Sequence, residues 1–259
     1  MHLLDLPVEI LSKVLCHAEP ENNFCRIALV CRQLRLVLHS SSVFRQIPFH
    51  IGQSHRHNFH RFVTTNTGIS TGITQLWISG NHEESLEIIL ASQNLVSLAC
   101  GRDLFGQLIK INDAHGLTHR FLRSLLILSG ISEVSKMPAG CFNDLCRNIR
   151  RLRVHSLLFE ECATIPGSFP NLTHISTWVE YGRDLLDACK TLPYLQRVIL
   201  DTYQWNWCQP NDTTRRILDA DERGRIRIVY WGKETEFSLW KHEEYWDVEM
   251  KDRAVTSRW

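Results

Sequence analysis

Four histidines between residues 50 and 60 form the densest group of potential metal ligands in the chain: His50, His55, His57 and His60. Imidazole nitrogens bind zinc and copper, so this spacing could provide a metal site. No cysteine or carboxylate lies among them, however, and nothing in the spacing fixes a tetrahedral arrangement. We therefore interpret residues 48–70 as a polar linker, and we expect no metal and no other cofactor.

The sequence carries none of the short motifs that mark common catalytic sites. It has no P-loop, no Gly-x-Gly-x-x-Gly, no Gly-x-Ser-x-Gly and no His-Glu-x-x-His. The absence of these motifs favours a binding protein over an enzyme. A hydrolase that uses an unrecognised site is a distant alternative.

Composition limits the partners and the compartment. The net charge is +1 with 22% charged residues, so the composition gives no general attraction to nucleic acid or to an anionic membrane. The sequence has no 18-residue apolar run, and its first residues lack the pattern of a signal peptide. Nine scattered cysteines without a Cys-x-x-Cys pair are typical of small buried side chains in a reducing compartment. We expect a cytoplasmic or nuclear protein.

A repeated apolar pattern begins near residue 71 and predicts short strands. Its form is aliphatic-x-x-aliphatic-x-aliphatic, and successive copies start 22 to 27 residues apart. Helical patterns over residues 84–91, 139–146, 183–189 and 213–218 alternate with these copies, and residues 226–230 add another strand. The six copies are Ile73, Leu76, Ile78; Leu95, Leu98, Cys100; Leu122, Leu125, Ile127; Ile149, Leu152, Val154; Leu172, Ile175, Thr177; and Leu195, Val198, Leu200.

The period and the pattern resemble leucine-rich repeats. One strand-helix unit of this size cannot bury its own apolar side, so such units stack and share one core. The resemblance implies an α/β fold, an irregular solenoid over residues 71–235 with parallel strands and helices on its convex side. The asparagine that the family places eight residues after the first aliphatic occurs only as Asn81. The alternative is an ordinary α/β domain with six short strands.

In register, the strands would bring basic residues together. The fourth and sixth positions of the pattern face the core, so the third and fifth positions face the concave surface. Arg151, His174 and Arg197 occupy the third position of three successive strands, and Arg153 the fifth position of one. Arginine forms bidentate contacts with carboxylate and phosphate. We therefore predict a substrate-binding patch for an acidic or phosphorylated target; solvated surface charges are the alternative.

Aromatic residues gather toward the C-terminus. Trp205 and Trp207 follow the last full copy of the pattern, and aromatic side chains of this kind anchor protein interfaces. They are candidate substrate-binding residues. Bulky residues are also needed to close the end of a repeat array, and residues 236–259 have the composition of such a C-terminal cap.

The N-terminal 45 or so residues predict two or three short helices. Pro7 suits a first helical turn, and apolar residues then recur at spacings of three or four up to Ala18 and again from Phe24 to Leu38. So small a helical hairpin cannot enclose all of this apolar surface. It therefore forms either a cap on the rest of the chain or a docking module.

The order of residues in this segment resembles an F-box, the module that binds the Skp adaptor of Skp-cullin-F-box ubiquitin ligases. The resemblance covers residues 3–47 and departs from the family at Leu34 and at Val43-Phe44, where tryptophan is usual. It implies the adaptor-binding residues Leu6, Pro7, Glu9, Ile10, Leu11, Val14, Leu15, Leu29, Val30, Cys31 and Leu34.

These observations together predict a non-catalytic receptor. The F-box would occupy residues 3–47, followed by the linker, the repeat region and the cap. It would bind the Skp adaptor and through it a cullin, while the repeat region would hold a target protein for ubiquitination. A repeat-type scaffold that binds partners without promoting ubiquitination is the alternative.

Overall fold

The computed structural model describes two groups of parallel strands, each with its connecting helices. It describes residues 7, 10, 48–116, 119–128, 144–154, 159–178, 185, 190–202 and 226–230. The chain divides into two compact units: unit 1 comprises residues 1–100 and 118–122, and unit 2 comprises residues 101–117 and 123–259. Each unit is described by itself.

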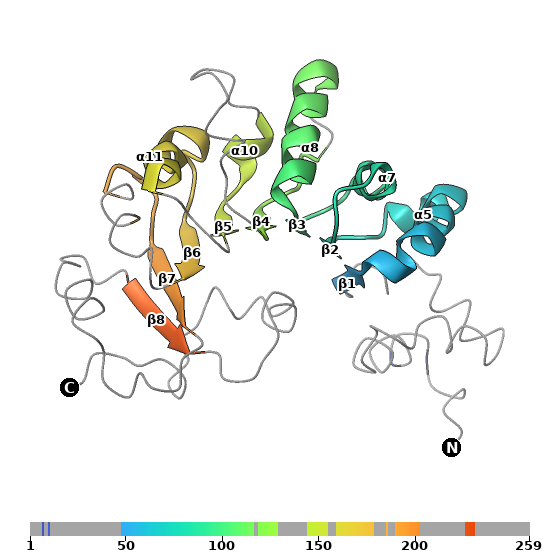
Figure 1. The fold of residues 1–259 in the computed structure, drawn as a ribbon, viewed down its shortest axis with the longest axis horizontal. Helices are drawn as coiled ribbons and strands as arrows, with labels where there is room; N and C mark the ends of the chain where they lie inside the picture. The colour runs from blue at the N-terminus through green and yellow to red at the C-terminus, as the bar shows by residue number, and fades with distance from the viewer. Residues whose placement is uncertain are drawn as a thin grey trace. The chain divides into compact units, whose positions relative to one another are not determined.

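Unit 1 contains a three-stranded parallel arrangement in the order β1, β2, β3. Helices α5 and α7 lie on the same side of these strands (Figure 1). The elements of the unit are β1 (Pro48–Ile51), the 3-10 helix η2 (Gln53–His55), α5 (Arg56–Thr65), α6 (Thr67–Ser70), β2 (Gln75–Ile78), α7 (Glu83–Ala91) and β3 (Ser97–Cys100).

Unit 2 contains five parallel strands in chain order, from β4 to β8. Helices α8, α10 and α11 lie on one side of its first strands (Figure 1). The elements are α8 (Arg102–His115), β4 (Ser124–Ile127), α10 (Asp144–Asn148), β5 (Arg151–Val154), α11 (Phe159–Ser168), β6 (His174–Trp178), β7 (Arg197–Thr202) and β8 (Ile226–Tyr230).

The repeated aliphatic pattern marks the core of both units. All residues at its first, fourth and sixth positions are buried, with exposed fractions of 6% or less. Equivalent positions lie side by side, since Leu76 pairs with Leu98 in unit 1, and Leu152 pairs with Leu125 and Ile175 in unit 2. The predicted α/β fold with parallel strands is confirmed and is compatible with a repeat-like solenoid. Its assignment to leucine-rich repeats stays a prediction.

A repeated backbone contact fixes the register. The carbonyl oxygen of the residue just before a strand accepts hydrogen bonds from two consecutive N–H groups one repeat later. In unit 1, the N–H groups of Val96 and Ser97 donate to Thr74 O at 2.8 and 3.0 Å. In unit 2, Arg123 O, Arg150 O and Thr173 O are the acceptors, and every one of these bonds is 2.8 to 3.1 Å long. Each carbonyl therefore satisfies two backbone donors at the start of the next strand.

Two sequence predictions need correction. Residues 48–70, expected to form a linker, contain β1, η2, α5 and α6. The linker prediction is wrong, because β1 starts at Pro48. The aliphatic pattern did not reveal this strand, since Gln46 stands where the first aliphatic residue of a copy would be. Proline suits the first residue of a strand.

The fifth position of the pattern, predicted to lie on an accessible concave surface, is buried instead. The six residues there have exposed fractions of 0 to 6%: Trp77, Ala99, Leu126, Arg153, Ser176 and Ile199. The strands are therefore shielded from solvent on both faces, as is usual in parallel sheets. Only the third position stays partly accessible in most strands, and Ser124 is buried even there.

Helix α8 was not anticipated, although its apolar residues follow helical spacing. Leu104, Phe105, Leu108 and Ile109 are fully buried on one face of this helix. The helix ends at Gly116, whose φ of 85° lies in the left-handed region that glycine adopts without a steric penalty. The helix predicted over 84–91 is confirmed by α7, and the strand predicted over 226–230 is confirmed by β8.

Thr177 provides a test of how the core is built. Thr177 lies in β6 at the sixth position of the aliphatic pattern, is 1% exposed, and its hydroxyl has no hydrogen-bond partner in the described part of the chain. Burying a hydroxyl without a partner is unfavourable by roughly 1–3 kcal/mol. We expect Thr177→Val to raise the free energy of unfolding by about 1 kcal/mol or more in urea titrations. Thr177→Ser, which keeps the hydroxyl and loses the methyl group, should lower it; a loss of stability in the valine variant would contradict this account.

Candidate protein-binding surfaces

The predicted row of basic residues exists in unit 2. Arg151 is the register partner of His174, and His174 is the partner of Arg197, at the starts of β5, β6 and β7. All three side chains are partly exposed. The juxtaposition of Arg151, His174 and Arg197 is thus confirmed, whereas their role in substrate binding stays a prediction.

Arg153 does not belong to this accessible row. It lies two residues after Arg151, between Leu126 and Ser176 on the neighbouring strands, and is 2% exposed. The Arg153 side chain therefore lies in the interior of unit 2, where a macromolecular partner cannot reach it. Its place among the predicted substrate-binding residues is therefore wrong. The other two candidates, Trp205 and Trp207, lie outside the described residues.

A hydrogen-bond network supports the start of these strands. The Thr173 hydroxyl donates to Arg150 O at 3.0 Å, and its oxygen lies 2.9 Å from His174 Nδ1. Because the hydroxyl hydrogen is engaged by Arg150 O, the Thr173 oxygen serves as the acceptor for Nδ1–H. The network orients the His174 ring at the middle of the row.

Two asparagines that are not among the predicted site residues connect successive repeats. Asn94 Nδ2 donates to Thr71 O at 2.7 Å in unit 1, and Asn171 Nδ2 donates to Arg147 O at 2.9 Å in unit 2. Each asparagine directly precedes the first aliphatic of its copy. The recurrence of asparagine directly before the first aliphatic was the available signal, whereas the leucine-rich-repeat resemblance points to an asparagine eight residues after that aliphatic.

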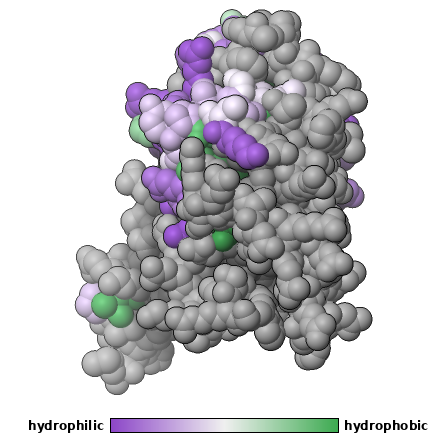
Figure 2. Space-filling view, turned by 90° about the vertical axis from the view of Figure 1, so that its left-hand side faces the viewer, coloured by the Kyte–Doolittle hydropathy of each residue, from purple (hydrophilic) through white to green (hydrophobic). Residues whose placement is uncertain are grey.

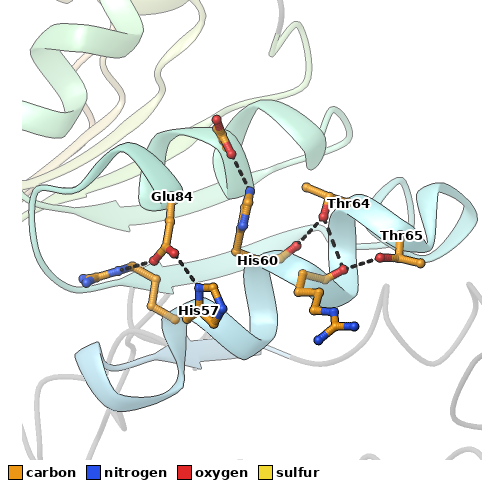
Figure 3. Close-up of polar contacts among 8 residues, drawn as sticks. His57, His60, Thr64, Thr65 and Glu84 are labelled. Atoms are coloured by element: carbon orange, nitrogen blue, oxygen red, sulfur yellow. Dashed lines mark hydrogen bonds and ion pairs between the residues drawn. The ribbon is translucent and has the colours of Figure 1, made fainter.

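The histidine-rich stretch packs α5 against α7. His57 Nδ1 lies 2.7 Å from one oxygen of Glu84, whose other oxygen accepts a hydrogen bond from Arg56 Nε at 3.2 Å (Figure 3). His60 pairs with Glu87, also on α7. The hydrogen bond from His57, with a smaller contribution from Arg56, holds the pKa of Glu84 below its ordinary value of 4.5.

These contacts give His57 and His60 a structural role. The two rings contact different carboxylates, and the described residues contain no cluster of three potential metal ligands. His50 lies elsewhere, on β1, where its ring is 5.8 Å from that of Trp77.

The two cysteines with described side chains are unsuited to chemistry. Cys100 and Cys146 are buried and not in disulfides. Burial raises the pKa of both thiols to about 12, so they stay protonated near neutral pH, and the thiolate is the reactive form. This agrees with the expectation that they act as small buried hydrophobes.

Little of the N-terminal segment is described, but two of its predicted adaptor-binding residues are. Ile10 N–H donates to Pro7 O at 3.0 Å, and Ile10 is helical and 44% exposed. The remaining predicted adaptor-binding residues lie outside the described residues. Proline therefore precedes a helical turn, as the sequence predicts, and the isoleucine of that turn is accessible.

Residues 3–50 match the F-box-like family. The F-box-like domain agrees with the resemblance over 3–47 and extends into β1, which pairs with β2 along its whole length. The search among curated proteins found no match to the chain. In the described part of the chain, no helix is long and apolar enough to cross a membrane.

Accessible surface around these elements is mostly polar. On the face shown in Figure 2, the described residues that reach the surface are mainly hydrophilic, with small hydrophobic areas. The exposed large apolar side chains of the described residues are Ile10, Val96, Phe121 and Tyr194. Contacts made by the repeat strands must therefore come largely from charged and polar groups.

His119 gives unit 1 a measurable pH dependence. Its ring is fully buried, lies 2.9 Å from Ile89 O through Nε2, and burial lowers its pKa from the ordinary 6.5. The unfolded chain therefore binds a proton below pH 6.5 that the folded chain does not, and stability must fall as the pH drops below that value. The full slope for one proton is about 1.4 kcal/mol per pH unit.

We expect His119→Gln, which keeps an N–H donor but does not titrate, to flatten this dependence in urea titrations between pH 7.5 and 5. The exposed His115 offers the control, because His115→Gln should leave the slope as in the unaltered chain. An unchanged slope in His119→Gln would show that other groups govern acid stability.

Proposed function

We propose that this chain is the substrate-recognition subunit of a Skp-cullin-F-box ubiquitin ligase. The observation that carries the proposal is the F-box-like domain at residues 3–50. F-box domains bind Skp adaptors, and F-box proteins are typically non-catalytic adaptor subunits of these ligases. The chain would therefore bind the adaptor, and through it a cullin, with the accessible surface that includes Ile10.

The repeat region would hold the target. Unit 2 offers partly exposed Arg151, His174 and Arg197 at the starts of three successive strands, and such side chains suit recognition of another protein. The chain's contribution to ubiquitination would be proximity, which raises the effective concentration of the target lysine near the charged enzyme. No catalytic residue of its own is needed for that role.

The position of the F-box-like domain supports this division of labour. The family match runs to residue 50, inside β1, and β1 pairs in register with β2. The adaptor-binding segment thus leads directly into the strands of unit 1. Its site of action would be the cytoplasm or the nucleus, where the buried free thiols of Cys100 and Cys146 suit a reducing environment.

We expect Ile10→Asp to abolish stoichiometric co-purification of the full chain with the Skp adaptor. A carboxylate at this position would have to be desolvated in the adaptor interface, which is strongly unfavourable without a partner. Val96→Asp is the matched control, since Val96 is 38% exposed against 44% for Ile10 and directly precedes β3 in unit 1. Size-exclusion chromatography of co-expressed proteins provides the measurement.

Adaptor binding by the unaltered chain and by these two variants distinguishes a ligase subunit from other possible functions. Equal adaptor binding by both variants would exclude the F-box surface as the contact. A folded chain that ignores the adaptor altogether would contradict the proposed function. A chain that binds the adaptor but neither recruits a cullin nor promotes ubiquitination of a bound protein would instead be a scaffold.

A further inference from the structure

Arginines line the edge of unit 2 at which strands β4 to β7 begin. Arg151, His174 and Arg197 are the first residues of β5, β6 and β7, and Arg123 and Arg150 directly precede β4 and β5. Arg123 and Arg150 are exposed, and the other three are partly exposed. We call these five residues the basic edge.

The charge of the basic edge is of one sign. Among the described side chains of unit 2, the carboxylates belong to Asp103, Asp113 and Asp144. The first two lie on α8, and Asp144 lies on α10, where it is 3.7 Å from Arg147. No described acidic side chain occupies the starts of β4 to β7, and side chains of basic type there suit an anionic partner.

The edge is also held in place before a partner arrives. Arg150 Nη1 donates to Asn171 O at 3.2 Å, while the Asn171 side chain donates to Arg147 O. Arg150 O in turn accepts the Thr173 hydroxyl. Fixing side chains and loops in advance reduces the conformational entropy lost on binding.

An exposed aromatic residue continues the same edge. Tyr194 directly precedes the first aliphatic of its copy, the position that Asn171 holds one repeat earlier, and it is 58% exposed. Tyrosine and arginine are the residue types most often found at the energetic centres of interfaces. Their combination suits a protein partner that carries negative side chains.

We propose that the basic edge binds an extended acidic segment, a run of aspartate or glutamate residues, in the target protein. This inference rests on the proposed function for the identity of the target. Neighbouring strands are about 4.8 Å apart, so the starts of β4 to β7 span roughly 14 Å, the length of about four or five extended residues. Basic side chains spread along these strand starts match carboxylates on successive residues of a peptide. A single phosphate would instead need several basic side chains to converge on one point. Arginine also binds carboxylates bidentately.

The test uses the full chain, alone and with the Skp adaptor, and a fluorescein-labelled peptide with six consecutive glutamates. Fluorescence anisotropy should show binding that a six-glutamine peptide lacks and that weakens as salt increases. Arg150→Glu combined with Arg151→Glu should weaken binding at least about tenfold, since two charge contacts are lost and two repulsions replace them. Adaptor binding should be unaffected.

The control makes the same charge change elsewhere. Arg61→Glu with Lys110→Glu alters two exposed cations on α5 and α8 and should leave peptide binding within about twofold of the unaltered chain. Equal loss in both double variants would overturn the assignment to the basic edge, because only the net charge would then matter. Equal binding of the glutamate and glutamine peptides would also overturn it.

Two further probes distinguish the source of negative charge. A peptide with a single phosphoserine, or a twelve-nucleotide single-stranded RNA, that binds the basic edge more tightly than the glutamate peptide would overturn the choice of an acidic segment. If the unaltered chain binds the glutamate peptide but not the adaptor, the proposed function is contradicted, whereas the assignment of peptide binding to the basic edge is not. Retained adaptor binding without peptide binding would contradict the inference alone.

Discussion

The in-register pairing of short parallel strands is the constraint on which both units depend. A four-residue strand buries too little surface to be stable alone, so each strand needs its neighbours on the sheet and the helices that pack against it. The shared carbonyl at the start of each strand, such as Thr74 O or Arg150 O, satisfies two N–H groups of the next. This contact prevents a slip by one residue, which would move aliphatic side chains from one face of the strand to the other.

The same constraint concentrates accessible chemistry at one edge. Burial on both faces removes Arg153 and its equivalents from contact with partners, so side chains become available mainly where the strands begin. Arg151, His174 and Arg197 are adjacent because their strands are in register. A surface assembled in this way draws residues from segments more than twenty positions apart in the sequence.

Polar contacts in unit 1 serve a different purpose. Glu84 on α7 pairs with Arg56 and His57 on α5, and Glu87 pairs with His60. The histidine-rich stretch therefore attaches α5, the first described α-helix after β1, to α7. The pairs are partly exposed, so solvent screens the attraction between their charges. Their importance is geometric, because the F-box-like domain ends in β1 and the chain enters α5 a few residues later.

The sequence by itself determined the repeat, its buried positions and the F-box-like domain, because these depend on the order and spacing of residues within short windows. Aliphatic spacing alone identified the core residues of strands β2 to β7, and the order of residues around Pro7 and Ile10 identified the F-box-like domain. Only the tertiary structure decided that residues 48–70 fold, that Arg153 is interior and that Arg123 and Arg150 join the basic edge. The reason is physical: alternation along a strand says which face a side chain occupies, but its burial depends on whether other parts of the fold cover that face.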